Sequence, residues 1–135
     1  MKPNACSIGL FNGDHVLLIQ RAFAPYAGYW TFPGGRMEPD ETPMECVKRE
    51  LFEETRLIVT DPVQVLVETV GEGATTYTLA VFADTVAMAA PVASPEISDW
   101  DWVHVDEVQA YRTTENLAEI VRACADCLSL ARAGQ

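Results

Sequence analysis

The chain has little positive charge and only short apolar runs. Nine basic residues stand against twenty acidic ones, for a net charge of −11, so it lacks the lysine and arginine clusters that bind nucleic acid backbones or anionic membranes. Its apolar runs, such as 86–90, are far too short to cross a bilayer. No basic stretch followed by a long apolar segment opens the chain. We therefore expect no nucleic acid or membrane partner and a cytoplasmic location.

Cysteine is also scarce, and its pattern does not indicate a disulfide framework. Two of the four cysteines, Cys124 and Cys127, have the spacing of a zinc or redox motif, but no second such pair accompanies them. They lie among apolar residues at helical spacing, so we interpret them as small buried helix residues. The other two are Cys6 and Cys46.

The remaining composition is that of a globular protein. The chain has 135 residues, of which 49% are apolar and 21% charged. It contains no internal repeats and no linker long enough to separate two units. We therefore predict one domain over residues 1–135.

Local patterns predict several strands. Two β-prone runs, 5–11 and 15–21, flank Asn12-Gly13-Asp14, which is typical of a tight β-hairpin turn. Further extended segments are expected at 31–37, with an interruption at Pro33-Gly34-Gly35, and at 57–70, 75–87 and 97–105. Pro62 is expected to interrupt the segment 57–70, and residues 71–73 to join it to the next one.

Two helices complete the prediction. The first is expected at 43–55, because Thr42, Pro43 and Glu45 supply an N-cap, a proline in the first turn and the acid of a capping box. The second is an amphipathic helix over 114–131. Several strands with one helix in the middle and one at the end favour an α+β fold, a mixed sheet covered by helices on two faces.

The first helix carries an unusual concentration of acids. Seven acidic and two basic residues lie between 38 and 54. At 100° per residue, one side is apolar, formed by Met44, Val47 and Leu51. A ridge along its edge is acidic, formed by Glu50, Glu53 and Glu54 beside Arg49. These acids repel one another, and they lie near the helix end where the macrodipole disfavours negative charge. Two interpretations remain open, a solvated face or a site for a divalent cation such as Mg²⁺, Mn²⁺ or Ca²⁺.

The stretch from Gly35 to Leu57 resembles the Nudix box, which is Gly, five residues, Glu, seven residues, then Arg-Glu-apolar-any-Glu-Glu-any-Gly-apolar. The matching residues are Gly35, Glu41, Arg49, Glu50, Leu51, Glu53, Glu54 and Leu57. The segments 17–21 and 30–35 also resemble the family. The last glycine of the pattern is Arg56 here. Because glycine suits a left-handed residue at a helix end, we expect either a different helix end or a strained Arg56.

The resemblance implies a Nudix-like α/β/α sandwich that hydrolyses a pyrophosphate bond in a nucleoside diphosphate linked to another group, with Mg²⁺ or Mn²⁺. It implies Glu50, Glu53, Glu54 and the carbonyl of Gly35 as metal ligands, with one of these acids or another accepting the proton of the attacking water. Arg49 lies four residues before Glu53 and is expected to orient a carboxylate of the site. It is also expected to pair with Glu41.

Other site residues are expected outside the acidic ridge. Arg21 is expected to hold a phosphate, with a surface arginine as the alternative, and Arg36 to contact the substrate. Glu96 is a candidate general base or additional metal ligand, with an ordinary loop acid as the alternative. Of the aromatic residues Tyr26, Tyr29, Trp30 and Phe32, one or two are expected to line the pocket, and Trp30 and Phe32 are favoured. His15 and His104 are given no catalytic role.

The expected substrate is a small nucleotide. ADP-ribose or a nucleotide sugar is the first hypothesis, because the first half of the chain most resembles ADP-ribose pyrophosphatase-like members, although the proline that many of them carry after the box is Gly73 here. An oxidised or ordinary nucleoside triphosphate is the alternative. A non-catalytic nucleotide-sensing domain and an acidic metal-buffering domain are further alternatives. A monomer or a homodimer is expected.

Overall fold

The centre of the molecule is a mixed β-sheet. The computed structural model describes residues 2–71 and 73–133, apart from the side chains of Thr75 and of residues 130–133. The strands are β1 (Ala5–Asn12), β2 (His15–Arg21), β3 (Trp30–Thr31), β4 (Gly34–Arg36), β5 (Val63–Val70), β6 (Tyr77–Thr85) and β7 (Ile97–His104). Their order is β3-β2-β1-β6-β5, with β4 paired to β1 and β7 paired to β2. β1 and β6 run parallel, while β1 and β2 form the predicted antiparallel hairpin.

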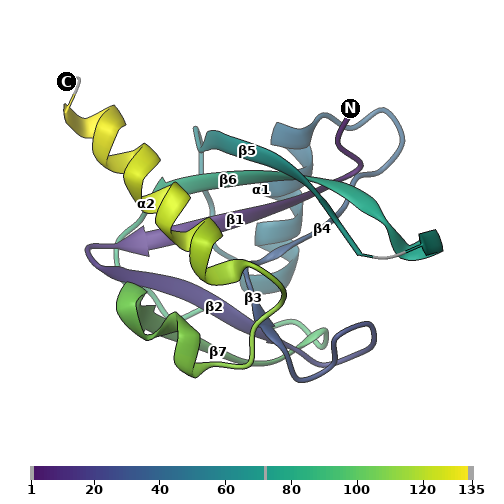
Figure 1. Cartoon of the computed structure of the whole chain (residues 1–135). Coiled ribbons are helices and arrows are strands. Elements are labelled where there is room, and N and C mark those ends of the chain that lie inside the picture. The colour runs from purple at the N-terminus through teal and green to yellow at the C-terminus, as the bar shows by residue number, and fades with distance from the viewer. Residues whose placement is uncertain (1, 72, 134–135) are drawn as a thin grey trace.

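Two helices cover the two faces of this sheet. They are α1 (Pro43–Thr55) and α2 (Leu117–Ala133), and two short 3₁₀ turns, η1 (Gly73–Thr75) and η2 (Val105–Ala110), lie in the connections. Figure 1 shows α2 in front of the sheet and α1 behind it. The predicted α+β sandwich, a mixed sheet flanked by helices, is confirmed.

The apolar core is divided between the two faces. On the α1 side, Ile8 and Leu10 of β1 pack with Val47 and Leu51 of α1. On the α2 side, Val16 and Leu18 of β2 pack with the apolar residues of α2. Strands β1 and β2 are buried on both faces, which explains why they are almost continuously apolar in the sequence.

Helix α1 begins and ends as its sequence predicts. The Thr42 side chain accepts a hydrogen bond from the Glu45 backbone N–H, and the Glu45 side chain accepts one from the Thr42 N–H, which completes the capping box. After Thr55, Arg56 takes the left-handed conformation, with φ 63° and ψ 10°. Of the two expectations for this position, the structure therefore shows the strained Arg56 and not a different helix end.

The other predicted boundaries shift by a few residues. The segment predicted from residue 57 becomes a strand only at Val63, directly after Pro62, which cannot donate to a sheet ladder. Helix α2 begins at Leu117, three residues later than predicted, because Thr113 and Thr114 instead contact Trp30 through the backbone. Glu72 of the predicted 71–73 connection lies outside the described residues, as does the side chain of Ala131. No helix in the described ranges is long and apolar enough to cross a membrane.

Candidate active site

The three acids at the end of α1, which we call the box acids (Glu50, Glu53 and Glu54), differ in their surroundings. Glu54 is 6% exposed, and its Oε1 accepts a hydrogen bond of 2.8 Å from the Gly34 N–H. Glu50 is half-buried against Gly35. Glu53 is exposed at the rim, with 55% of its side chain accessible. The acidic ridge that the sequence predicts therefore extends from the protein interior to solvent.

Two glycines allow the strand β4 to lie between α1 and β1. A Cβ atom at Gly35 would overlap the carboxyl group of Glu50, and a Cβ atom at Gly34 would overlap the backbone carbonyl of Cys6 on β1. A larger residue at Gly34 would therefore push β4 away from β1, whereas one at Gly35 would displace the carboxyl group of Glu50. At the interruption predicted for Pro33-Gly34-Gly35, the backbone approaches α1 closely and brings the Gly34 N–H to Glu54.

Arg49 connects the box acids to the loop before α1. Its guanidinium donates two hydrogen bonds to Glu41, of 2.6 and 2.9 Å, one of 2.8 Å to Glu50 and one of 3.2 Å to Glu53. It also donates to the backbone carbonyl of Arg36. The hydrogen bonds from Arg49 lower the pKa of Glu41 to about 2. The expected pairing of Arg49 with Glu41 and Glu53 is present, and it offsets part of the repulsion among the acids.

Glu96 reaches the box acids from a distant part of the sequence. The loop before β7 is tied to the end of α1 by hydrogen bonds from the Val92 N–H to the Thr55 carbonyl and from the Ser94 N–H to the Glu54 carbonyl. As a result, Glu96 and the three box acids line a depression of about 170 Å³, together with Ser94 and Pro95. Four carboxylates from two segments therefore face one small space.

Burial and mutual repulsion alter the acidity of these groups. Burial, together with the charges of Glu50 and Glu96, raises the pKa of Glu54 to about 8, against the lowering effects of the Gly34 N–H and Arg21. Burial also raises the pKa of Glu50, against the lowering effect of Arg49. A nearby cation would relieve both penalties.

The oxygen atoms of the box acids and of the Gly35 carbonyl are suitable ligands for a hard divalent cation. In this structure, however, the carboxylates are not gathered into a metal site. Among the residues that the structure describes, no three His, Cys, Asp or Glu side chains lie close enough together to form a ready-made metal site. The reason is visible in the contacts: Arg49 holds Glu50 and Glu53, whereas the Gly34 N–H holds Glu54. Carboxylate and carbonyl oxygens are nevertheless the ligands that Mg²⁺ and Mn²⁺ prefer, and Glu50 already lies against Gly35.

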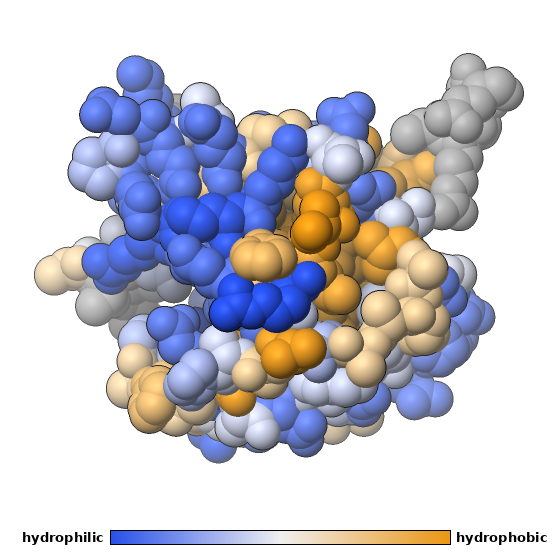
Figure 2. All heavy atoms as spheres, turned by 180° about the vertical axis from the view of Figure 1, so that it is seen from behind, coloured by the Kyte–Doolittle hydropathy of each residue, from blue (hydrophilic) through white to orange (hydrophobic). Residues whose placement is uncertain are grey.

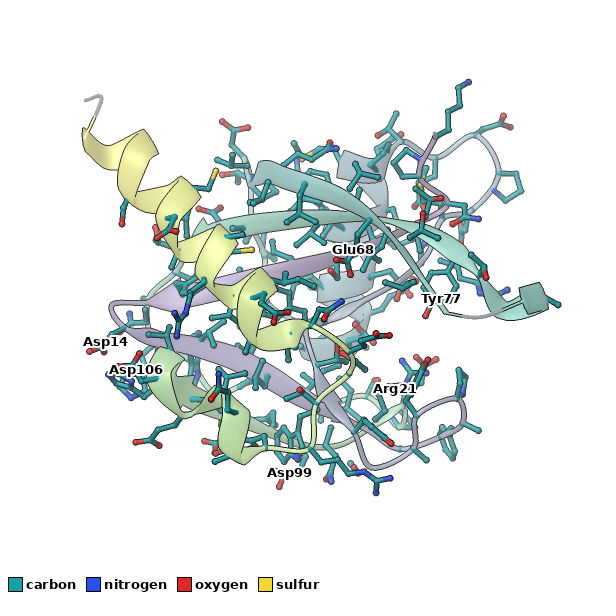
Figure 3. All side chains as sticks on the ribbon, viewed as in Figure 1. Asp14, Arg21, Glu68, Tyr77, Asp99 and Asp106 are labelled. Atoms are coloured by element: carbon teal, nitrogen blue, oxygen red, sulfur yellow. The ribbon has the colours of Figure 1, made fainter. Side chains whose placement is uncertain are left out.

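A larger cavity of about 320 Å³ also reaches Glu50, Glu54 and Glu96. Its other walls come from the sheet and from the start of α2, and include Phe32, Leu79, Leu117 and Ile120. They carry a second acidic group, Glu68 on β5 and Glu115 before α2, which we call the cavity pair. Figure 3 shows Glu68 and Arg21 approaching this region from β5 and from β2.

The predicted substrate contacts are only partly at this cavity. Arg21, Arg36 and Phe32 line it, whereas Trp30 is not among its lining residues. The Trp30 ring packs edge-on against Tyr111, with 5.2 Å between ring centroids, and belongs to the core beneath α2. The structure therefore places Trp30 in the core and not in the cavity wall. Tyr26 lines the cavity in its place, so two of the four aromatic candidates are there.

The cavity pair is the feature that the sequence analysis missed. Glu68 is the one charged residue in the otherwise neutral β5 sequence VQVLVETV, and it is half-buried. That lone acid in an apolar strand was an available signal. Burial and the charge of Glu115 raise the pKa of Glu68, and both residues line the same cavity. Glu115 carried no comparable signal, because it is exposed and lies in a loop.

The two histidines and the two cysteines of α2 lie away from the cavity. His15 and His104 both hydrogen-bond to Asp14 at the hairpin end, and Figure 3 shows Asp14 and Asp106 far from Arg21. Cys124 is buried and Cys127 is half-buried on α2, and both are free thiols.

Figure 2, the view from behind, shows hydrophilic side chains over much of the face behind the sheet, with a band of hydrophobic ones beside them.

The fold and the box acids together define a sandwich protein with an acidic site at the end of its first helix. The model of the NUDIX domain matches residues 1–124, and this chain belongs to the NUDIX family. A MutT NUDIX hydrolase from Burkholderia pseudomallei has a similar structure, with a TM-score of 0.81 at 21% identity over 91% of this chain and 98% of that one. This likeness supports the fold.

Curated relatives match only part of the chain. The 8-oxo-dGDP phosphatase NUDT18 of Mus musculus is 40% identical over 70 residues, which is 49% of this chain and 21% of that protein. An 8-oxo-dGTP diphosphatase of Proteus vulgaris is 42% identical over 48 residues, 35% of this chain and 43% of that one. An ADP-ribose pyrophosphatase of Methanocaldococcus jannaschii is 41% identical over 59 residues, 43% of this chain and 35% of that one. The matches thus span less than half of each relative.

Proposed function

We propose that this protein hydrolyses a pyrophosphate bond in an oxidised guanine nucleoside di- or triphosphate, with Mg²⁺ or Mn²⁺ as cofactor. The observation that carries the proposal is that one cavity joins two acidic groups, the box acids Glu50 and Glu54 and the cavity pair Glu68 and Glu115. The first group suits a metal-bound diphosphate. The second suits a base that presents hydrogen-bond donors.

The charge of the protein makes a cation necessary for a polyphosphate substrate. A chain with a net charge of −11 repels a diphosphate. A bound Mg²⁺ or Mn²⁺ would neutralise charge in the transition state and lower the pKa of the attacking water. Glu50, Glu54 and the Gly35 carbonyl are the proposed ligands, with Glu53 at the rim. Arg21 and Arg36, which line the cavity, are proposed to bind phosphate oxygens.

The residues at the rim are suited to handle the proton. The Glu53 side chain is exposed, and Arg49 donates a hydrogen bond to its Oε2 atom. Arg49 does not bond to the Oε1 atom, which is left to accept a proton. Glu96 faces the same depression from the opposite segment. We propose that one of these two carboxylates accepts the proton from water, and that Arg49 fixes the box acids as a positioning residue.

The cavity pair favours guanine over adenine. Carboxylates accept hydrogen bonds, and one edge of guanine presents the N1–H and the exocyclic N2–H₂ as neighbouring donors, whereas an 8-oxo base has a further donor, N7–H, on its other edge. Adenine presents one exocyclic amine as a donor, and the ring nitrogens beside it are acceptors. A carboxylate is also an acceptor, so it would repel these nitrogens. The relatives named for 8-oxoguanine nucleotides point the same way. The order of the two sequence hypotheses, with ADP-ribose first, is therefore reversed here.

ADP-ribose remains the second candidate. The ADP-ribose pyrophosphatase of M. jannaschii matches 59 residues at an identity similar to that of the 8-oxoguanine relatives. A non-catalytic sensing role is a weaker alternative, because every acid of the box is present.

A substrate panel with matched variants tests the proposal. Purified protein with Mg²⁺ or Mn²⁺ is given 8-oxo-dGTP, 8-oxo-dGDP, dGTP and ADP-ribose, and the products are separated by ion-exchange chromatography. We expect the highest kcat/KM for an 8-oxoguanine nucleotide, and no turnover with EDTA. The control variant is Asp126→Asn, which changes an exposed acid on α2 that does not line the cavity. Binding without hydrolysis of any of these nucleotides would instead support a sensing domain.

A further inference from the structure

A second pair of cysteines lies between β1 and α1, directly beneath the candidate site. The Sγ atoms of Cys6 and Cys46 are 2.7 Å apart, although 40 residues separate them in the chain. Both side chains are buried, and both are free thiols. The S–S bond of a disulfide is about 2.0 Å long, so a small movement of the two side chains would bring the sulfur atoms to bonding distance.

The two thiols differ in how a reagent can reach them. Cys6 lines the 320 Å³ cavity, whereas Cys46 lies behind it and does not contribute to the cavity wall. Cys46 is 0% exposed, and its Sγ is 3.8 Å from the Gly35 carbonyl. Cys6 is therefore the thiol that a reagent entering the cavity meets first. Because Cys6 is only 1% exposed, the oxidant has to be small.

We propose that Cys6 and Cys46 form a reversible disulfide when hydrogen peroxide enters the cavity, which makes this pair an oxidation site within the fold. In the first step the Cys6 sulfur attacks one oxygen of the peroxide, the O–O bond breaks, and Cys6 becomes a sulfenic acid with release of water. In the second step the Cys46 sulfur attacks the Cys6 sulfur and the S–OH bond breaks, with release of a second water. Two thiols are oxidised and one peroxide is reduced to two waters.

This proposal does not depend on the nucleotide hydrolase activity. It rests on the position of two sulfur atoms and on the cavity that reaches one of them. Cys46 lies one helical turn before Glu50, so the disulfide would join β1 covalently to the helix that carries the box acids.

Peptide mapping of the wild-type protein tests the bond directly. Trypsin places Cys6 in a peptide that ends at Arg21, Cys46 in 37–48, and both Cys124 and Cys127 in 123–132. After peroxide treatment and alkylation of the remaining thiols, we expect a linked peptide pair containing Cys6 and Cys46, with the summed mass less two hydrogens. It should disappear with dithiothreitol. It should form about tenfold or more faster in folded protein than in protein unfolded in urea, because the fold holds the sulfur atoms together.

Variants test the order of the two steps. In Cys46→Ser, Cys6 should accumulate as a sulfenic acid that dimedone labels, whereas in Cys6→Ser the remaining Cys46 should stay unlabelled. The control is the double variant Cys124→Ser/Cys127→Ser, which keeps the pair and should form the linked peptide at the wild-type rate. The proposal is overturned if folded wild-type protein forms the link no faster than unfolded protein, or if Cys46 is labelled as fast as Cys6. The wild-type experiment is decisive even if a variant does not fold.

Discussion

The two acidic groups of the cavity are held in opposite ways. The box acids have fixed partners, with Arg49 on Glu50 and Glu53 and the Gly34 N–H on Glu54. In the cavity pair, burial and the charge of Glu115 raise the pKa of Glu68. The protein thus prearranges one group, whereas the other is the one proposed to bind the base of the substrate. This difference is what we expect between a part of a site that performs a reaction and a part that selects the molecule.

The largest effect is expected from removing a prearranged carboxylate. Glu54→Gln and Glu53→Gln should each lower kcat by about a thousandfold, because both remove negative charge where the cation is proposed to bind. The far-ultraviolet circular dichroism spectrum should not change, and Asp126→Asn should retain wild-type turnover. Full activity in a Glu53→Gln/Glu54→Gln double variant would refute the assignment of the box acids.

The buried state of Glu54 also predicts how metal-free stability depends on pH. Its pKa is raised from 4.5 to about 8 in the folded protein, so folding favours its protonated form. The stabilisation is complete below pH 4.5 and is lost as the pH rises through 8, with a total on the order of 3–5 kcal/mol. Urea unfolding in EDTA should therefore show stability falling between pH 5 and 8.5.

Two comparisons sharpen this pH experiment. Glu54→Gln should be more stable than wild type at pH 8.5 and should show a shallower decline, since the uncharged amide stays in place of the acid. Adding Mg²⁺ at pH 8 should restore stability in the wild type more than in the variant. An unchanged slope in Glu54→Gln would mean that another group causes the decline.

A smaller effect is expected at the cavity pair. Glu68→Gln/Glu115→Gln should lower the ratio of kcat/KM for 8-oxo-dGTP to that for ADP-ribose by about tenfold, because each substitution replaces one acceptor by a donor. Turnover of a substrate lacking the base, at saturating concentration, should change little. The matched control is Glu119→Gln, an exposed acid in the first turn of α2 outside the cavity wall. An unchanged ratio would separate the cavity pair from substrate choice.

The same division explains what could be predicted from the sequence. The box acids and Arg49 lie on one helix, so helical geometry and the capping signals at Thr42 and Glu45 determine their arrangement. The resemblance to a known motif added Gly35, and the structure shows why a glycine is needed there. These contacts are local in the chain, and local patterns are what a single sequence reveals.

The rest of the site depends on contacts between distant residues. Glu68 and Glu115 come from a strand and a loop 47 positions apart, and only the packing of α2 on the sheet brings both to one cavity. Trp30 was expected to line the substrate pocket, but its ring packs on Tyr111, which no local pattern indicates. The Cys6–Cys46 contact likewise requires the packing of α1 on β1.

The smallest expected effect concerns Arg56, where α1 ends beside the box acids. Arg56→Gly should stabilise the protein by about 0.5 kcal/mol: glycine takes a positive φ without the cost of about 1 kcal/mol that another residue bears, but the substitution removes the exposed contact of the guanidinium with Phe52, whose ring centroid is 5.0 Å away. Thermal unfolding at fixed pH measures this difference, with Arg56→Ala as the control that loses the contact and keeps the strain. Because the Arg56 N–H to Phe52 hydrogen bond is retained in both variants, kcat and the substrate ratio should stay at wild-type values. A large fall in kcat for Arg56→Gly would show that the geometry of the box acids depends on the residue that ends their helix.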